Sequence, residues 1–211
     1  MTVRSLIFAP DSMSNNMTKA ERTKQLIIDK SAPLFNKKGI AGTSLSDILE
    51  VTKLAKGSLY VHFENKEAIS HAVVDHFVMQ KIAYLNSTLN GPGDAKTRLF
   101  AYLDVFLNPL TPPFVGGCPF LNFGMESDDT DQVIRNKVKN AVETAQWYIA
   151  KTVKGGISAG EFDSNWNPEA FALKLFSMMQ GAVMISRVTE DRSVMSSISQ
   201  LIKEEITSHT I

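Results

Sequence analysis

The chain has 211 residues, and its 22 lysine and arginine residues balance 22 aspartate and glutamate residues. Apolar residues make up 44% of the chain and charged residues 21%, which excludes an intrinsically disordered protein and indicates one or two globular domains. The single cysteine, Cys118, cannot form an intramolecular disulfide, which favours a reducing, cytoplasmic setting. No segment approaches the roughly 20 consecutive apolar residues of a membrane helix, so no membrane partner is expected.

The overall balance of charge hides an unequal distribution along the chain. Residues 1–66 carry ten bases and six acids, a net charge of +4, whereas residues 67–211 carry twelve bases and sixteen acids, a net charge of −4. A basic first third favours an anionic partner for that part alone, and a chance imbalance is the competing explanation.

Helix signals recur along the chain, and strand signals are nearly absent. Residues 1–16 precede the first of these signals and are interpreted as a disordered leader. Thr18 and Glu21 form a capping box, in which each side chain satisfies a free backbone N–H at the start of a helix. This helix should end at Gly39, which suits the left-handed C-terminal position, and it contains Pro33, which removes one backbone hydrogen bond.

Three more helices are expected before the clearest break in the chain. Ser44 predicts the start of a second helix, and a short third helix covers residues 56–61. Asn65 caps a long fourth helix over residues 66–89. The sequence Asn-Gly-Pro-Gly at residues 90–93 then interrupts the helical pattern.

Five further helices complete the predicted fold. They are expected over about residues 94–107, 118–126, 130–154, 168–188 and 193–207. The helix that begins at Pro168 is apolar almost all round, which predicts burial in a core or in a subunit interface. The predicted fold is therefore all-α with about nine helices.

The first three helices form a candidate DNA-binding unit. Two short helices behind a longer supporting helix form a helix-turn-helix, which places its second helix in the major groove. Gly57 has no side chain and lets that helix approach DNA closely, while Lys56 and Tyr60 can bind phosphates. Lys66 adds a positive charge at the start of the next helix, and Phe63 is interpreted as part of the supporting core.

Two segments of this unit resemble a known family. Residues 35–48, FNKKGIAGTSLSDI, and residues 56–67, KGSLYVHFENKE, resemble the DNA-binding domain of the TetR (tetracycline-repressor-like) transcriptional regulators. The resemblance implies a helix-turn-helix domain over residues 17–66 and a ligand-binding and dimerisation domain over residues 67–211. It implies a homodimer, a palindromic operator in double-stranded DNA, and repression that a small-molecule effector releases.

The resemblance also implies which residues contact DNA. They are Thr43, Ser44, Lys56, Gly57, Ser58, Tyr60, His62 and Lys66. One departure from the family pattern is Ala55, which replaces the Ser or Thr that usually caps the second helix of the motif. A protein of this fold that has lost its affinity for DNA is a rival interpretation, and the intact set of Lys56, Tyr60 and Lys66 argues against it.

The remaining chain resembles the effector-binding part of the family more loosely, through residues 117–120 and 167–170. A pocket is expected between the middle helices, and its aromatic and methionine residues favour an apolar or aromatic effector. The same residues at helical spacing are also explained by a plain core. The candidate lining residues are Tyr102, Phe106, Phe114, Cys118, Phe120, Met125, Trp147, Tyr148 and Met179.

The last two helices are expected to pair with their mates in a four-helix dimer interface. Gly181 and Ala182 permit close helix approach. The competing interpretation places the apolar side chains of these helices in the core of one chain. The interface candidates are Phe171, Leu175, Met178, Ala182, Ile185 and Ile198.

Other functions receive less support from the sequence. Cys118 follows a loop at a helix start, so a redox- or electrophile-sensing regulator is the alternative function. Glu67, His71 and Asp75 share one helix face, either as metal ligands or, more simply, as a solvated polar stripe. The chain lacks a phosphate-binding glycine loop and the HExxH and GxSxG motifs, so neither an enzyme nor a cofactor is expected.

Overall fold

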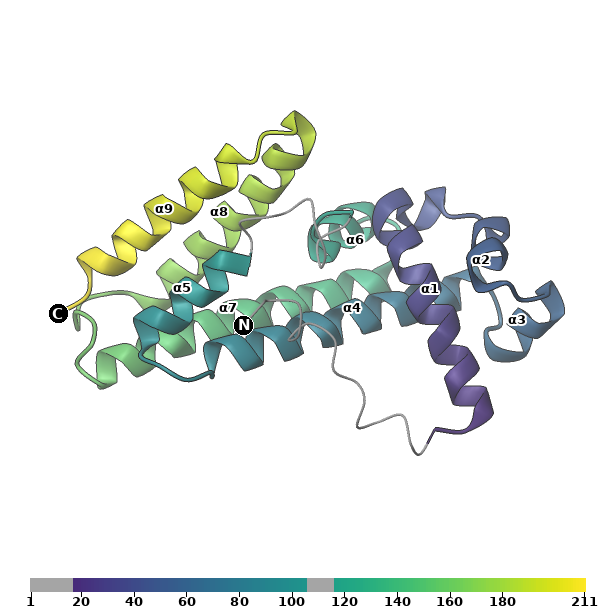
Figure 1. Ribbon diagram of the computed structural model, residues 1–211, viewed down its shortest axis with the longest axis horizontal. Coiled ribbons are helices and arrows are strands. Elements are labelled where there is room, and N and C mark those ends of the chain that lie inside the picture. Colours follow the sequence, from purple (N-terminus) through teal and green to yellow (C-terminus); the bar gives the residue numbers. More distant parts are fainter. Residues whose placement is uncertain (1–16, 106–115) are drawn as a thin grey trace, which may run out of the picture.

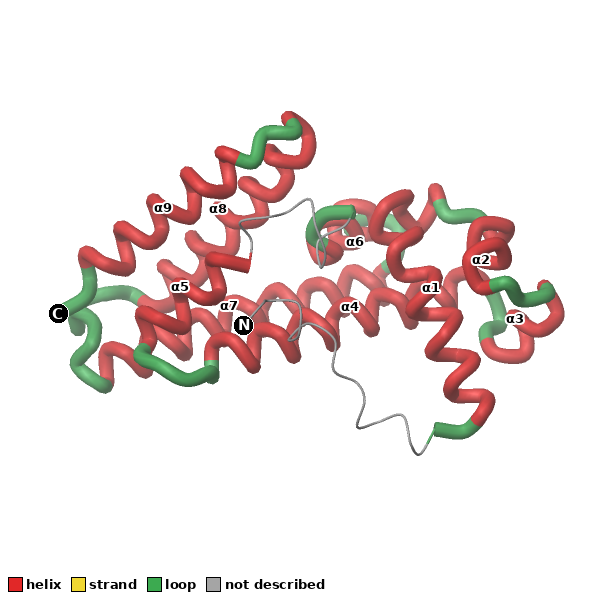
Figure 2. The backbone as a smooth tube through the Cα atoms, viewed as in Figure 1, coloured by secondary structure: helices red, strands yellow, loops and turns green. Residues whose placement is uncertain are grey.

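The computed structural model describes residues 17–105 and 116–211, which form nine α-helices (Figures 1 and 2). In these two ranges there is no strand, and a single β-bridge joins Phe162 to Thr210. The helices are α1 (Lys19–Gly42), α2 (Leu45–Thr52), α3 (Lys56–His62), α4 (Lys66–Leu89), α5 (Ala95–Val105), α6 (Pro119–Ser127), α7 (Gln132–Ser158), α8 (Pro168–Thr189) and α9 (Ser193–Ser208). The prediction of an all-α fold is confirmed.

The helices form an elongated molecule with α1, α2 and α3 at one end (Figure 1). The long helices α4 and α7 lie side by side along the length of the molecule and connect this end to the rest. At the other end α8 packs on α7, and α9 packs on α8 and α5. None of the helices in the described ranges combines the length and the apolar character that crossing a membrane requires.

Four N-caps, three of them predicted above, fix where their helices begin. The side chains of Thr18, Ser44, Asn65 and Asn167 each accept a hydrogen bond from a backbone N–H in the first turn. Such a cap satisfies a donor that would otherwise lack an intrahelical partner. Ala55, at the start of α3, provides no side-chain cap, as its sequence predicts.

Two helices end later than expected. α1 runs on to Gly42, but Gly39 has a φ of 78° and a non-helical conformation, so the predicted break is present as a kink. α7 runs to Ser158 instead of ending near residue 154. Gly156 therefore does not end the helix. It allows close packing, because a Cβ at this position would lie 2.4 Å from the ring of Phe162.

The three N-terminal helices pack firmly on the remaining chain. α1 contacts α4 and α6 as well as α2 and α3. Phe35 of α1 and Ile69 of α4 are completely buried in one continuous core. α4 begins at Lys66, beside the predicted domain boundary, and the division into two domains stays a prediction.

Candidate nucleic-acid interface and effector cavity

The α2–α3 unit is held on α1 by apolar side chains. Ile48 of α2 and Leu59 of α3 are completely buried, and Phe63, directly after α3, is 5% exposed. Between the two helices Lys53 adopts a left-handed conformation with φ 58°, and its N–H bonds to the carbonyl of Leu49. This tight connection leaves one face of α3 turned outward, as a helix that enters a DNA groove requires.

The outward face of α3 carries four of the eight predicted DNA contacts. Lys56, Gly57, Ser58 and Tyr60 are all exposed. Apart from the backbone of α3 itself, the residues that the structure describes place no atom within 4 Å of the position that a Cβ at Gly57 would take, so α3 is open to a close approach here. Ser44, at the start of α2, is exposed as well.

Two predicted contacts, Thr43 and Lys66, make hydrogen bonds within the chain. The side chain of Thr43 is completely buried and donates a hydrogen bond of 2.7 Å to the carbonyl of Gly39. Its expected DNA contact therefore requires correction, because a buried hydroxyl cannot reach a phosphate. The ammonium of Lys66 donates to the carbonyls of Ile40, at 2.8 Å, and Thr43, at 3.0 Å. His62 is half-buried at the end of α3, and its contact with DNA stays a prediction.

A carboxylate of α6 binds the backbone N–H groups of the same turn. Glu126 accepts hydrogen bonds from the backbone N–H of Ile40, at 2.8 Å, and of Ala41, at 2.7 Å. Lys66 thus binds the carbonyls of the turn at residues 39–43, while Glu126 binds its amides. The residue type of Glu126 alone gives no indication of this role, because the sequence separation from Ala41 is 85 residues.

A second polar link joins α1 to the loop before α6. The amide of Asn36 donates to the carbonyl of Gly117, at 3.1 Å. Asn122 of α6 donates to the side-chain oxygen of Asn36, at 3.0 Å, and to the carbonyl of Gly116, at 2.7 Å. Both glycines have φ values above 90°, which other residues rarely adopt. α6 is therefore tied to α1 near both of its ends.

The chain contains a cavity that α4, α5, α6, α7 and α8 enclose. Its volume is about 20 Å³, which is room for a molecule the size of water, and it is partly open to solvent. Its polar lining is Lys81, Tyr84, Tyr102, Cys118 and Gln180, and its apolar lining is Leu85, Phe120, Ala145 and Phe176. The structure thus brings together three of the predicted lining residues, and their role in binding an effector stays a prediction.

Burial in this cavity shifts the pKa values of three of its polar side chains. Burial lowers the pKa of Lys81, although the nearby Cys118 acts in the opposite direction. Burial raises the pKa of Tyr102 far above its ordinary value and that of Tyr84 more modestly, so both phenols stay neutral. The sequence pattern did not reveal Lys81 or Gln180, because a polar residue on a long helix is more commonly on its solvated face.

Other predicted lining residues lie elsewhere. The side chains of Met125 and Trp147 are 68% and 55% exposed, so their placement in the cavity is corrected. Trp147 borders a shallow groove with Lys151 and Lys154 instead. Met179 is completely buried but is not among the residues that line the cavity, and Tyr148 is half-buried with its hydroxyl 3.3 Å from Asn86. Phe106 and Phe114 fall outside the described residues.

The predicted dimer residues divide into two groups. Phe171, Leu175 and Ala182 are at most 2% exposed within the single chain, so they belong to its own core and their assignment to the interface is corrected. Met178 and Ile198 are half-buried, and Ile185 is 42% exposed. The large apolar side chains that α8 and α9 leave most exposed are Leu173, Met184, Val188 and Leu201.

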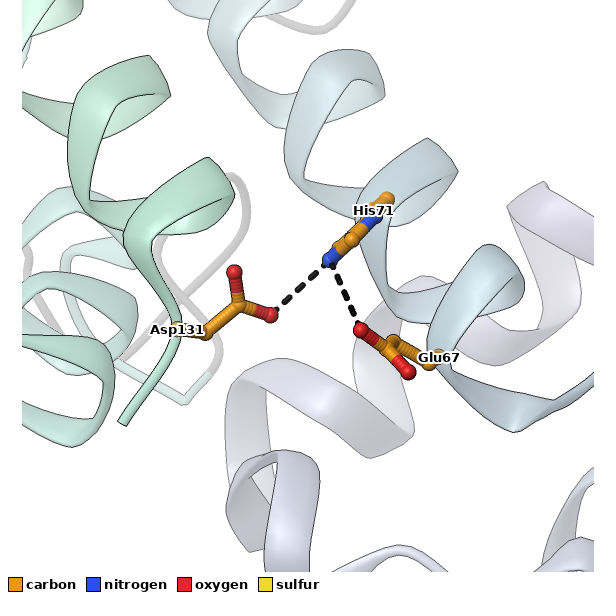
Figure 3. Close-up of side chains that lie close together, drawn as sticks. All are labelled: Glu67, His71 and Asp131. Carbon is orange, nitrogen blue, oxygen red and sulfur yellow. Dashed lines mark hydrogen bonds and ion pairs between the residues drawn. The ribbon is translucent and has the colours of Figure 1, made fainter.

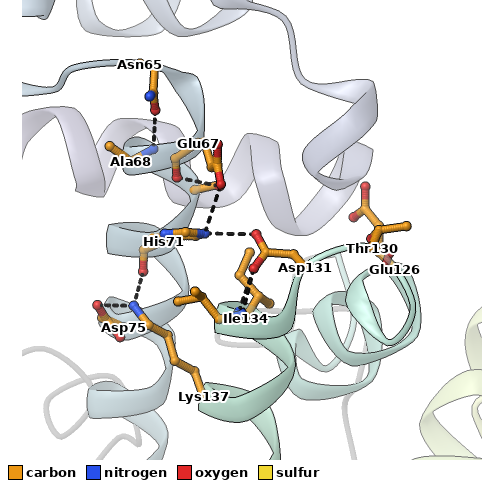
Figure 4. A network of polar contacts seen from close by, with 12 residues as sticks. Asn65, Glu67, Ala68, His71, Asp75, Glu126, Thr130, Asp131, Ile134 and Lys137 are labelled. Carbon is orange, nitrogen blue, oxygen red and sulfur yellow. Dashed lines mark hydrogen bonds and ion pairs between the residues drawn. The ribbon is translucent and has the colours of Figure 1, made fainter.

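The polar face of α4 that carries Glu67, His71 and Asp75 is divided between two partners (Figures 3 and 4). His71 Nε2 lies 2.8 Å from Asp131 Oδ2 and 4.0 Å from Glu67 Oε1, whereas Asp75 pairs with Lys137 at 2.6 Å. Glu67, His71 and Asp131 could together hold a metal ion. Asp131 already caps α7 through two backbone N–H groups, so this cluster has a structural role in joining α4 to α7.

Comparisons with known proteins agree with this architecture. Residues 27–73 match the family model described as bacterial regulatory proteins, tetR family, and residues 95–202 match the tetracyclin repressor-like C-terminal domain. The HTH-type transcriptional regulator TtgR from Pseudomonas putida is 37% identical over 170 residues, which cover 78% of this chain and 80% of that protein. The HTH-type transcriptional repressor DhaR from Mycobacterium sp. is 25% identical over 87% of this chain and 91% of that protein.

Solved structures extend the agreement to three dimensions. A TetR transcriptional regulator from Chloroflexus aurantiacus superposes with a TM-score of 0.85 and 34% identity, covering 92% of this chain and 98% of that one.

The redox alternative is not favoured, because the thiol of Cys118 is buried and the relatives are helix-turn-helix repressors and regulators. The exposed α3, its buried support and the two matched models together establish that the chain belongs to the TetR family of transcriptional regulators.

Proposed function

We propose that this protein is a transcriptional repressor that binds a two-fold symmetric operator as a homodimer and is released by a small effector. It acts in the cytoplasm and has no catalytic role. The observation that carries the proposal is the exposed face of α3, where Lys56, Ser58 and Tyr60 surround an unobstructed Gly57. The net charge of +4 in residues 1–66 supports binding to DNA. The similarity to DhaR, a transcriptional repressor, supports repression rather than activation.

Binding to genomic DNA in a gel-shift titration tests this proposal. Fragments from the region that flanks the gene should include one that binds at least about a thousandfold more tightly than random DNA at physiological salt. Lys56→Ala should change the preferred sequence or weaken specific binding. Lys37→Ala removes an equally exposed lysine from α1 and serves as the matched control. If every fragment binds as random DNA does, the operator-binding function is refuted.

The proposed dimer uses the exposed stripe of α8. Leu173, Gly181, Met184 and Val188 follow one another at intervals of eight, three and four residues, so they lie on one face of this helix. Leu173, Met184 and Val188 are between 47% and 76% exposed. Exposed apolar side chains around a glycine suit a second copy of the same helix, because the glycine permits a close approach.

A bulky residue at Gly181 tests the dimer without disturbing the single chain. Apart from the backbone of its own helix, no atom of the described residues lies within 4 Å of a Cβ at this position, so Gly181→Leu should fold normally. We expect it to elute as a monomer in size-exclusion chromatography with light scattering, where the original protein elutes as a dimer. Gly155→Leu is the matched control, since Gly155 is also helical and unobstructed but lies on α7. A dimeric Gly181→Leu variant would exclude this face.

A further inference from the structure

Three side chains that can ligate a metal ion meet between α4 and the start of α7 (Figure 3). Glu67 and His71 lie one turn apart on α4, and Asp131 lies directly before α7. One ligand atom from each of these side chains lies within 4.8 Å of the other two. A zinc ion lies about 2.0–2.2 Å from nitrogen and oxygen ligands, so it holds its ligand atoms about 3–4 Å apart. The cluster therefore needs only a small movement to surround an ion.

The ligand atoms are directed toward a common point. His71 Nε2 lies 2.8 Å from Asp131 Oδ2. Asp131 Oδ1 accepts hydrogen bonds from the backbone N–H groups of Val133 and Ile134, at 2.9 and 3.0 Å, and such bonds fix the orientation of a ligating carboxylate. Glu67 Oε1 lies 4.0 Å from the same histidine nitrogen, and the Glu67 side chain is 70% exposed, so it can turn toward an ion freely.

A neighbouring contact holds the two helices at this spacing (Figure 4). The ammonium of Lys137, on α7, donates to the carbonyl of His71 at 3.2 Å and pairs with Asp75 at 2.6 Å. The charge of Lys137 thus compensates Asp75, the remaining acid on this face of α4. Because this contact positions the ligands before an ion binds, less ordering is required on binding.

The charge and the chemistry of the cluster favour a divalent transition metal. Two carboxylates and a neutral imidazole carry two negative charges, which one divalent cation balances. The N-termini of α4 and α7 oppose a cation, but each is equivalent to only about half a positive charge, so the carboxylates outweigh them. An imidazole nitrogen suits zinc and similar metals, whereas magnesium and calcium prefer oxygen ligands alone.

We propose that Glu67, His71 and Asp131 bind one Zn²⁺ ion, whose remaining coordination is completed by water. The bound ion joins the first two turns of α4 to the start of α7 and stabilises this contact. The site is separate from the exposed face of α3, and the inference does not depend on the proposed binding to DNA.

Calorimetry with zinc chloride tests the site on the intact protein without a histidine tag, after treatment with a chelator. We expect one ion per chain with a dissociation constant of about 10 μM or less. Glu67→Gln removes an exposed ligand but leaves the contact between His71 and Asp131, and it should weaken zinc binding about tenfold or more. His71→Gln should weaken it at least as much.

Two variants of the same helix serve as matched controls. Asp75→Asn changes the acid that pairs with Lys137, and His76→Gln removes the other histidine of α4. Both should bind zinc within about twofold of the original protein, because neither residue belongs to the cluster.

Thermal unfolding provides an independent readout. Zinc at about a hundredfold above its dissociation constant should raise the melting temperature by about 5–10 °C, and a chelator should reverse the shift. At the same zinc concentration, a tenfold weaker Glu67→Gln variant should show about half of this shift. Cobalt(II) in place of zinc should give visible absorption bands that change in His71→Gln, since the imidazole is then no longer a ligand.

Four results would overturn the assignment. They are absence of zinc binding, zinc binding that is unchanged in both Glu67→Gln and His71→Gln, loss of zinc binding in His76→Gln, and magnesium binding as tight as that of zinc. Failure of the protein to bind any operator would refute the proposed function instead, because none of these measurements contains DNA.

Discussion

Lys66 is the first residue of α4, but its side chain binds backbone carbonyls at the end of α1. Its ammonium binds the carbonyls of Ile40 and Thr43, at 2.8 and 3.0 Å. A cation is unfavourable at the N-terminus of its own helix and favourable near the C-terminus of α1, whose last turn has no basic residue. The position of this charge is therefore explained by the turn after α1, and we expect Lys66→Met to loosen that turn.

The expected loss of stability follows from these two contacts. Hydrogen bonds to charged groups contribute about 1.5–3 kcal/mol each, and Lys66 is half-buried, so water can replace part of the interaction. Lys66→Met keeps most of the apolar stem and should lower the free energy of unfolding by about 2 kcal/mol. Urea unfolding followed by far-ultraviolet circular dichroism, at one protein concentration for all variants, measures this change.

The same variant distinguishes a structural role from a DNA contact. Lys37→Met, which removes an exposed lysine of α1, should unfold within about 0.5 kcal/mol of the original protein. A phosphate contact would instead reduce the slope of the logarithm of DNA affinity against the logarithm of salt concentration by about one. The reasoning fails if Lys66→Met retains full stability and loses one unit of this slope.

Four further predictions concern the turn after α1, the exposed face of α3 and the middle of α4. Gly39→Ala should cost about 1–3 kcal/mol of stability, because its φ of 78° strains an alanine whose Cβ would lie 2.8 Å from Glu126; urea unfolding would contradict this if the midpoint stays unchanged. Gly57→Ala, where the space is open, should keep its unfolding midpoint and lose DNA affinity in gel shifts, and undiminished affinity would argue against a close approach. Glu126→Gln should speed amide hydrogen exchange at Ile40, and unchanged protection would show that the carboxylate is dispensable. Burial lowers the pKa of His76 below 6.5, so the unfolded state binds the proton more readily and stability should fall as the pH drops below 6.5; a His76→Gln variant with the same pH profile would contradict this.

The local signals in the sequence predicted the helices well. Caps such as Ser44 and Asn167 act within three residues, so a single sequence contains everything needed to recognise them. The motif of α3 was equally local, and Leu59 is the one fully buried residue of this helix, as a helix that lies on the surface of the core requires. The kink at Gly39 was anticipated because glycine tolerates its φ, although the helix resumes after it.

The long-range contacts could not be predicted in the same way. Lys66 was interpreted as a DNA contact because an exposed lysine and a structural one look identical in a sequence. Its partner Ile40 is 26 residues away, and the contact between Glu126 and Ala41 spans 85 residues. The exposure of Met125 and Trp147 was missed for a related reason, since apolar side chains are not confined to the interior.

The turn at residues 39–43 also has a mechanical consequence. It is held by a cation on α4 and an anion on α6, and each charge grips a different set of backbone groups. If α6 moves along α4, the amides bound by Glu126 move with α6, while the carbonyls bound by Lys66 stay with α4. The turn is then twisted. Because α2 and α3 follow directly after this turn, a small translation of α6 would change the angle of α2 and α3 relative to α4. Lys66 and Glu126 thus couple the positions of α4 and α6 to the conformation of these five residues.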